Sequence, residues 1–333
     1  MTTNPCAACS WTPERQRRSF YESQVKLIST KGNRGIWSIG NGLILKDRGP
    51  GLRSFETFNA NFVREKTIIP VPTIIGSWQD GDRVVILMKR IPGEPLSKLW
   101  PKLKPKERES IAKQTAGYLS QLRRLTSDKI QGVGNRPIYS NLLFPYKRGG
   151  DSFPPHGPFS SDDALWADMG IGIKKTFPAS MYDDLRRVMP PAKPYTFTHC
   201  DLASDNIMVQ DGKVKGILDW EYSGYFPVWW EYVCTSAAFN QEDQEWKTLL
   251  RKHLRDFTRA RDWWSTYCVV CNDVEEDDES GSNTLADSVG DGEGQGKKTH
   301  LERDIRSDGD YSDDEPYRSE SEKSIEAKRR NSM

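Results

Sequence analysis

The sequence predicts an α+β fold with a small β-rich N-terminal lobe, a mainly helical C-terminal lobe and a disordered acidic tail. Short apolar runs separated by glycine turns dominate the chain before residue 90, which is typical of strands. Apolar residues then recur at helical spacing, and finally Gly, Ser, Asp and Glu dominate. We therefore divide the chain into an N-terminal extension (1–19), an N-lobe (20–90), a C-lobe (91–271) and the tail (272–333).

The N-lobe is predicted to contain a β-hairpin over residues 35–47, GIWSIGNGLILKD. Its apolar runs flank an Asn-Gly dipeptide, which favours the tight turn between two antiparallel strands. Two further strands are expected at 68–78 and 83–91, because apolar runs flank the polar turn QDGD at 79–82.

A helix is expected between the hairpin and the later strands, over 54–67. Ser54 is placed to cap its first turn. Four residues at helical spacing are predicted to form its apolar face: Phe55, Phe58, Phe62 and Val63.

The C-lobe is predicted to begin with a helix within 100–127, where apolar residues gather near one face. Residues 131–160 are rich in Gly and Pro, which predicts a long loop with a functional or packing role. A second helix is expected over 161–177, because Ser161 and two acidic residues are typical of a helix N-terminus. Strands are expected at 194–199 and 206–220, and further helices follow.

Composition excludes several classes of protein. The net charge is +1, so no global charge points to nucleic acid or a membrane surface. The chain has no apolar run of about 18 residues, and its N-terminus lacks the apolar core of a signal peptide. We therefore expect a monomeric cytoplasmic protein, with the nucleus as an alternative location, that binds neither nucleic acid nor a membrane.

The cysteines are expected to be reduced thiols in that compartment. Cys6 and Cys9, and Cys268 and Cys271, form two C-x-x-C pairs, and four thiolates suit zinc. The pairs lie at opposite ends of the chain in poorly patterned sequence, so ordinary free cysteines are favoured over a zinc site.

The tail differs in charge from the rest of the chain. From Asp273 onward there are 19 acidic and 9 basic residues, whereas the preceding part has 39 basic and 28 acidic residues. Apolar residues are too sparse to offset the entropy of ordering, which predicts disorder. Serines beside acids at 312–315 and 319–322 suit phosphorylation or simple solubilisation, and the tail is the candidate contact for a protein partner.

Polar side chains concentrate in residues 197–209, FTHCDLASDNIMV. His199, Asp201 and Asn206 have the H-x-D-x-x-x-x-N spacing of the kinase catalytic loop. In that loop the Asp contacts the hydroxyl that receives the phosphate, and the Asn binds Mg²⁺. A hairpin with an Asp-Gly turn follows and is expected to bring Asp219 back beside Asn206, so that two oxygen ligands face a Mg²⁺–nucleotide.

The motif continues in GILDWEYSGYFPVWWEYV at 216–233, and the whole stretch closely resembles the aminoglycoside phosphotransferase and choline kinase-like family, in the form common in fungi. IPVP at 69–72, ILMKRIPGEPL at 86–96 and PPHGPFSSDDAL at 154–165 resemble segments of that family in the same order. The resemblance covers roughly residues 20–260.

The resemblance implies a bilobal protein kinase-like fold with ATP and Mg²⁺ between the lobes. Lys46 would hold the α- and β-phosphates and pair with Glu56, with Glu65 as the alternative partner. Asp201 would orient or deprotonate the acceptor hydroxyl, with Asn206 and Asp219 on Mg²⁺ and His199 bracing the loop. The implied hinge, whose backbone bonds the adenine, is the segment Leu87–Ile91, including Met88, Lys89 and Arg90.

The sequence departs from the family pattern in three places. Cys200 stands where the family usually has Gly, which adopts φ > 0 at lower cost. The segment at 29–37, STKGNRGIW, lacks G-x-G-x-x-G as a phosphate-covering loop, and the predicted ordered chain ends near residue 270, before the further helices of relatives. Trp220 and Glu221 are candidate substrate residues, with the protein core and a helix cap as their alternative roles.

The sequence thus predicts a phosphotransferase that moves the γ-phosphate of ATP to a hydroxyl of an unidentified small molecule. The alternative is a catalytically weak pseudokinase that acts as a nucleotide- or partner-binding module, which Cys200 and the short C-lobe favour. A protein kinase is disfavoured, because DFG and APE-like segments are absent from the sequence.

Overall fold

The computed structural model describes residues 14, 18, 24–50, 55–145 and 154–280. The described residues belong to one unit of the chain, Met1–Asp287. The predicted cap Ser54, the cysteine pair near the N-terminus and the predicted tail from 281 onward lie outside the described residues.

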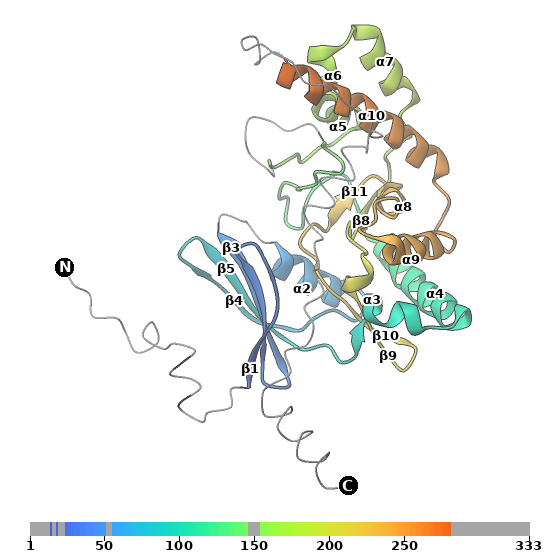
Figure 1. The fold of residues 1–333 in the computed structure, drawn as a ribbon. Helices are drawn as coiled ribbons and strands as arrows, with labels where there is room; N and C mark the ends of the chain where they lie inside the picture. The colour runs from blue at the N-terminus through green and yellow to red at the C-terminus, as the bar shows by residue number, and fades with distance from the viewer. Residues whose placement is uncertain (1–13, 15–17, 19–23, 51–54, 146–153, 281–333) are drawn as a thin grey trace, which may run out of the picture. The chain divides into compact units, whose positions relative to one another are not determined.

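A five-stranded antiparallel sheet forms the N-lobe, with the strand order β1-β2-β3-β5-β4 (Figure 1). The register places Lys46 opposite Ile36 on one side and Ile86 on the other, so that Lys46 lies on the middle strand of the sheet. The strands are β1 (Val25–Lys31), β2 (Arg34–Ile39), β3 (Leu43–Pro50), β4 (Ile74–Asp80) and β5 (Arg83–Lys89).

The predicted hairpin over 35–47 is confirmed as β2 and β3, but the N-lobe differs from the prediction elsewhere. Strand β1 was not expected, and it pairs with β2 through the segment that we considered as a phosphate-covering loop. The predicted strand over 68–78 begins only at Ile74. Two prolines explain the difference, since Pro70 and Pro72 cannot donate to a ladder; the carbonyl of Pro70 instead accepts from Ile217 N at 2.9 Å.

Helix α2 (Glu56–Lys66) confirms the expected helix, and Val63 and Phe62 face the core as predicted, but Phe58 does not. Glu56 and Asn59 are buried, whereas Phe58 is 49% exposed. The Arg136 guanidinium lies 3.8 Å from the centroid of the Phe58 ring and covers part of this exposed aromatic surface. The helix therefore directs polar side chains inward, towards the residues described in the next section.

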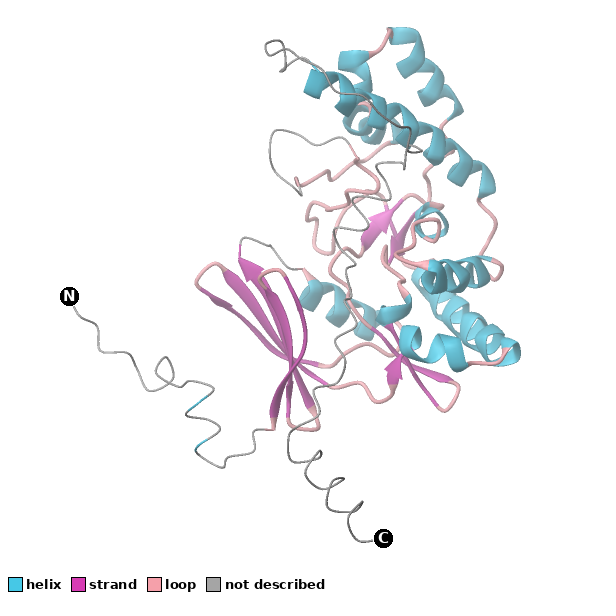
Figure 2. Ribbon diagram, viewed as in Figure 1, coloured by secondary structure: helices cyan, strands magenta, loops and turns pink. Residues whose placement is uncertain are grey.

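The C-lobe is mainly helical, with two small three-stranded sheets (Figure 2). Its first half contains β6 (Glu94–Pro95), α3 (Leu96–Leu99), η1 (Trp100–Lys102), α4 (Pro105–Leu122), β7 (Thr126–Ser127), α5 (Asp162–Met169), α6 (Ile171–Thr176) and α7 (Ala179–Val188). Its second half contains β8 (Tyr195–Thr198), η2 (Ser204–Asn206), β9 (Ile207–Gln210), β10 (Lys213–Ile217), β11 (Gly224–Phe226), α8 (Trp230–Cys234), α9 (Gln241–Arg251) and α10 (Thr258–Ser280).

Helix α4 buries Ile111, Thr115, Leu119 and Leu122 on the face that the sequence predicts. The Oγ of Ser161 accepts from Ala164 N at 3.1 Å, as expected for the start of α5. Helix α10 continues to Ser280 and passes the predicted boundary at 272. Within the described part of the chain, no helix is long and apolar enough to cross a membrane.

The main core joins α4, α9 and the strands around residues 197–217. Trp100 and Trp246 meet edge to face in it, with ring centroids 5.9 Å apart. Trp246 also donates from Nε1 to the carbonyl of Leu202 at 2.9 Å. The core therefore packs against the loop between β8 and β9 and holds it through Trp246.

Candidate active site

His199 braces the loop between β8 and β9 by hydrogen bonds at both ring nitrogens. It is fully buried, with Nε2 2.8 Å from the Leu218 carbonyl and Nδ1 3.2 Å from Asp201 N. Nε2 donates and Nδ1 accepts, which requires a neutral ring. Burial lowers the pKa of His199 to about 4, so the ring stays neutral at physiological pH.

Asn206 and Asp201 are joined within the same loop. The Asn206 amide nitrogen donates to the Asp201 carbonyl at 3.0 Å and to its Oδ2 at 3.1 Å. Because the nitrogen is committed to Asp201, the Asn206 side chain offers its carbonyl oxygen to a cation. Burial raises the pKa of Asp201 to about 6, although the Lys247 ammonium opposes this change.

The hairpin of β9 and β10 brings Asp219 beside Asn206, as expected. Leu218 N donates to the Asn206 carbonyl at 2.8 Å. The turn is made by Asp211 and Gly212, both with positive φ, and this left-handed pair matches the predicted Asp-Gly turn. Asp219 itself has a φ of 60°, an uncommon conformation for a residue other than glycine.

Lys46 connects the N-lobe to this segment. Its Nζ lies 2.9 Å from Glu56 Oε2 and 2.8 Å from Asp219 Oδ1. Burial alone would raise the pKa of Asp219, but the Lys46 ammonium and the Arg48 guanidinium lower it to about 2, so the carboxylate is ionised. Glu65 is not the partner of Lys46, because its side chain is 70% exposed and pairs with Lys66.

The predicted hinge differs in part from the structure. Leu87 and Met88 lie inside β5, between β3 and β4. The amides of Lys89 and Arg90 donate to Thr73 and Gly42 carbonyls, each at 2.9 Å, so neither is free to bond adenine in this structure. Ile91 follows, and the chain leaves the sheet there.

Trp220 is not a substrate residue in this structure. Its side chain is 0% exposed, its Nε1 donates to the Ile217 carbonyl at 2.8 Å, and its ring meets that of His199 edge to face. The indole therefore belongs to the core below the loop. Glu221 forms an ion pair with Arg48, so its carboxylate already has a cationic partner and is not a helix cap.

Two buried carboxylates that sequence reasoning missed, Glu231 and Asp243, hold the loop between β8 and β9. Glu231 accepts from His199 N at 2.7 Å and from Cys200 N at 3.3 Å. Asp243 accepts from Ser204 N at 2.8 Å. Cys200 has a φ of 74°, the left-handed conformation that the usual Gly would adopt at lower cost, and Glu231 stabilises it there.

Asn59 was also missed, and it ties helix α2 to the segment after Asp219. Its side-chain nitrogen donates to the Trp220 carbonyl at 2.8 Å and to the Ser223 carbonyl at 2.9 Å. Both protons of a fully buried amide are thus used. One feature of the sequence could have identified Asn59. It follows Glu56 by three residues, so both side chains lie on the same face of the helix.

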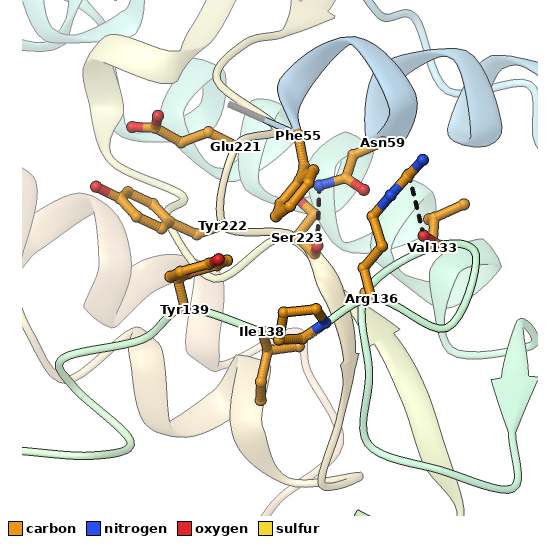
Figure 3. Close-up of a pocket in the computed structure, with 11 residues that line it drawn as sticks. Phe55, Asn59, Val133, Arg136, Ile138, Tyr139, Glu221, Tyr222 and Ser223 are labelled. Carbon is orange, nitrogen blue, oxygen red and sulfur yellow. Dashed lines mark hydrogen bonds between the residues drawn. The ribbon is translucent and has the colours of Figure 1, made fainter. Parts of the chain in front are cut away.

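A small pocket adjoins this segment (Figure 3). It is lined by the start of α2, the loop at 132–139 and residues 221–223. Phe55, Tyr139 and Tyr222 border it, and the Glu221 carboxylate lies on the same side as the Tyr222 hydroxyl (Figure 3). Burial raises the pKa of Tyr222 to about 12, so the hydroxyl keeps its proton and can donate a hydrogen bond.

Comparison with known proteins identifies the family of this chain. Residues 21–263 match the model of the phosphotransferase enzyme family. The chain belongs to this family. The match confirms the predicted resemblance and covers both lobes. A search of curated proteins finds no significant match.

Solved structures of phosphotransferases match at low identity. The streptomycin–ATP–APH(2")-IIa ternary complex has a TM-score of 0.50 and 13% identity, over 80% of this chain and 93% of that chain. An aminoglycoside-3'-phosphotransferase of type VIII has a TM-score of 0.48 and 15% identity, over 77% and 97%. Macrolide 2'-phosphotransferase MphH from Brachybacterium faecium has a TM-score of 0.45 and 8% identity, over 91% and 98%. The first match confirms the bilobal kinase-like fold of this family member.

Glu231 is expected to make the stability of this phosphotransferase depend on pH. Burial raises its pKa to about 7, against the hydrogen bonds from His199 and Cys200 and the charge of Arg123, while Asp201 adds to the increase. Between its ordinary pKa and about 7, the folded protein keeps a proton that the unfolded chain has released. The free energy of unfolding should therefore fall by about 3 kcal/mol as pH rises through this window.

Urea unfolding from about pH 5 to about pH 8 measures this slope, with Glu231→Gln as the variant that cannot titrate. In Glu231→Gln the free energy of unfolding should not show this fall of about 3 kcal/mol as pH rises. Equal slopes in the two proteins would contradict the assignment to Glu231.

Proposed function

We propose that this chain is an ATP- and Mg²⁺-dependent phosphotransferase that transfers the γ-phosphate to a hydroxyl of a small molecule. The observation that carries the proposal is the ion-paired group of Lys46, Glu56 and Asp219, which lies beside the Asp201–Asn206 loop. This group joins a cation on the N-lobe to carboxylates on α2 and on the segment after β10. Such a combination suits a phosphate chain with its metal.

The side chains present fit Mg²⁺. Asn206 offers a carbonyl oxygen and Asp219 an ionised carboxylate, and hard oxygen donors are the ligands that Mg²⁺ prefers. When bound, Mg²⁺ would neutralise charge on the phosphates.

Each residue has a defined task in the proposed reaction. Lys46, held by Glu56, orients phosphate oxygens. Asp201 accepts a hydrogen bond from the acceptor hydroxyl and takes its proton, while Asn206 holds that carboxylate in place. The backbone of Ile91, just after the chain leaves β5, is the proposed contact for adenine.

The acceptor is proposed to be a small molecule because the solved relatives with this fold include a complex of APH(2")-IIa with streptomycin and ATP. The pocket of Figure 3 is a candidate for part of the acceptor site, since it is bordered by Tyr222, three residues after Asp219. Its Phe55 and Tyr139 rings suit an apolar edge of the acceptor.

The pseudokinase alternative rests on the strained Cys200 beside Asp201. Binding of ATP with and without Mg²⁺, followed by the melting temperature of the full chain, tests the proposal first. Mg²⁺-ATP at a hundredfold excess over its Kd should stabilise the protein by about 2.7 kcal/mol. Asp219→Ala should abolish the Mg²⁺-dependent part of this stabilisation, because it removes the ionised metal ligand.

Asp80→Ala, an exposed aspartate on β4, is the matched control and should respond to Mg²⁺-ATP like the unmodified protein. No shift in the unmodified protein at millimolar Mg²⁺-ATP would reject the proposal. A shift without ATP consumption for any hydroxyl acceptor would favour the pseudokinase.

A further inference from the structure

Arg48 is a second cation in the site, more deeply buried than Lys46, and the sequence motifs did not single it out. It follows Lys46 by two residues on β3, so both side chains leave the same face of the sheet. Arg48 is 4% exposed and forms an ion pair with Glu221. Its Nη1 also lies 3.9 Å from Asp219 Oδ1 and 4.0 Å from Glu56 Oε2.

The burial of this ion pair distinguishes it from an ordinary surface pair. A buried guanidinium is costly unless carboxylates neutralise it, and here three surround it together with Lys46. On the opposite face of β3, Asp47 pairs with Arg83 at 2.7 Å, but both of those side chains are partly exposed. Of the two ion pairs on β3, the Arg48–Glu221 pair therefore faces Lys46 and Asp219, while the Asp47–Arg83 pair lies on the opposite face.

The segment Asp219–Ser223 depends on contacts from the N-lobe. Asp219 has a positive φ, which a residue with a Cβ adopts at a cost, so its conformation needs support from outside the segment. Lys46 holds the Asp219 carboxylate, and Asn59 holds the carbonyls of Trp220 and Ser223. Arg48 contacts Glu221 of the same segment.

We propose that Arg48 is a positioning residue for the metal-binding carboxylate: through its ion pair with Glu221 it clamps the segment after β10 to strand β3 and aligns Asp219 with Lys46. This inference rests on the proposed function, because it assigns Asp219 to the metal. Arg48 acts through Glu221 and Asp219 and does not touch the nucleotide.

The competing role for Arg48 is direct contact with a phosphate. Its Nε is buried and has no hydrogen-bond partner among the described residues, so it retains a donor. The two roles differ in one measurable respect. A clamp on Asp219 changes how much Mg²⁺ strengthens nucleotide binding, whereas a phosphate contact changes nucleotide binding with and without Mg²⁺.

The experiment is calorimetric titration of the full chain with ADP, once with Mg²⁺ and once with a chelator. The variants are Arg48→Met, Glu221→Gln and the double variant. The control is Arg83→Met on β5, which deletes the ion pair to Asp47 on β3. The gain in affinity from Mg²⁺ should fall about tenfold in each single variant, as for other residues that orient a metal ligand. The double variant should lose no more than either single one, because both deletions break the same contact.

Affinity for ADP without Mg²⁺ should change less than about threefold in all of these proteins, and Arg83→Met should keep the full Mg²⁺ gain. Should Arg48→Met fail to fold, Glu221→Gln, which keeps the side-chain volume, and the charge-free double variant give the same readout.

Equal weakening of ADP binding with and without Mg²⁺ in Arg48→Met would overturn the inference in favour of a phosphate contact. An unchanged Mg²⁺ gain in Arg48→Met or Glu221→Gln would overturn it in favour of a purely structural ion pair. In both cases the proposed function stands. Absence of a Mg²⁺ gain in the unmodified protein would instead reject the proposed function, and the inference with it.

Discussion

Asp201→Asn is expected to lower the turnover rate about a thousandfold while leaving the affinity for Mg²⁺-ATP within about threefold. The asparagine has the same shape and can still accept from Asn206, whose amide nitrogen lies 3.1 Å from Asp201 Oδ2. It cannot take a proton from an acceptor hydroxyl. The substitution therefore separates proton removal from nucleotide binding, and ATP consumption with an identified acceptor measures the first.

Asp211→Asn provides the matched control for this substitution. Asp211 is an exposed residue in the β9–β10 turn with a φ of 52°, and asparagine adopts this conformation readily. The same chemical change should leave turnover unaltered there. Retention of more than about a third of the rate in Asp201→Asn would show that Asp201 is not the base in this protein.

The sequence predicts the site residues that lie in one short loop and the hairpin after it. The spacing of His199, Asp201 and Asn206 follows from one loop, and the position of Asp219 follows from one hairpin with an Asp-Gly turn. Short-range patterns of this kind are fixed by strand alternation and turn chemistry. The structure accordingly brings these four residues together as expected.

Residues that support the loop from a distance could not be found in the same way. Glu231 lies 32 positions from its partner His199, and Asn59 lies 161 positions from Trp220. Neither belongs to a local pattern, because a polar residue on a helix is usually solvated. Their importance depends on burial, which only the packed chain reveals.

Incorrect predictions have equally specific causes. Apolar residues at 68–73 suggested a strand, but Ile69 is buried while Ile68 lies on the surface. Pro70 and Pro72, which follow them, prevent a ladder. Phe58 was expected in the core, although Arg136 provides a cation–π contact at the surface instead. In both cases an apolar side chain was assumed to be buried, although single apolar residues are often exposed on the surface.

Trp220→Ala is expected to lower the free energy of unfolding by about 4 kcal/mol. The indole is fully buried, and its removal leaves a cavity between the His199 ring and the core below the loop. Since His199 bonds Asp201 N and the Leu218 carbonyl, the loop between β8 and β9 should also loosen. Urea unfolding measures the stability loss, and hydrogen exchange at the Asp201 amide measures the loosening.

Trp78→Ala, on the exposed face of β4, is the control for loss of an indole, and its stability should change by no more than about 0.5 kcal/mol. Trp220→Phe should lose less than Trp220→Ala, because a ring still fills most of the cavity. If Trp220 instead lined a substrate pocket, Trp220→Ala would raise the KM for the acceptor with little loss of stability. The buried hydrogen bond to Ile217 argues for the first outcome, because an indole whose polar and apolar surfaces are both enclosed by protein has nothing left to offer a ligand.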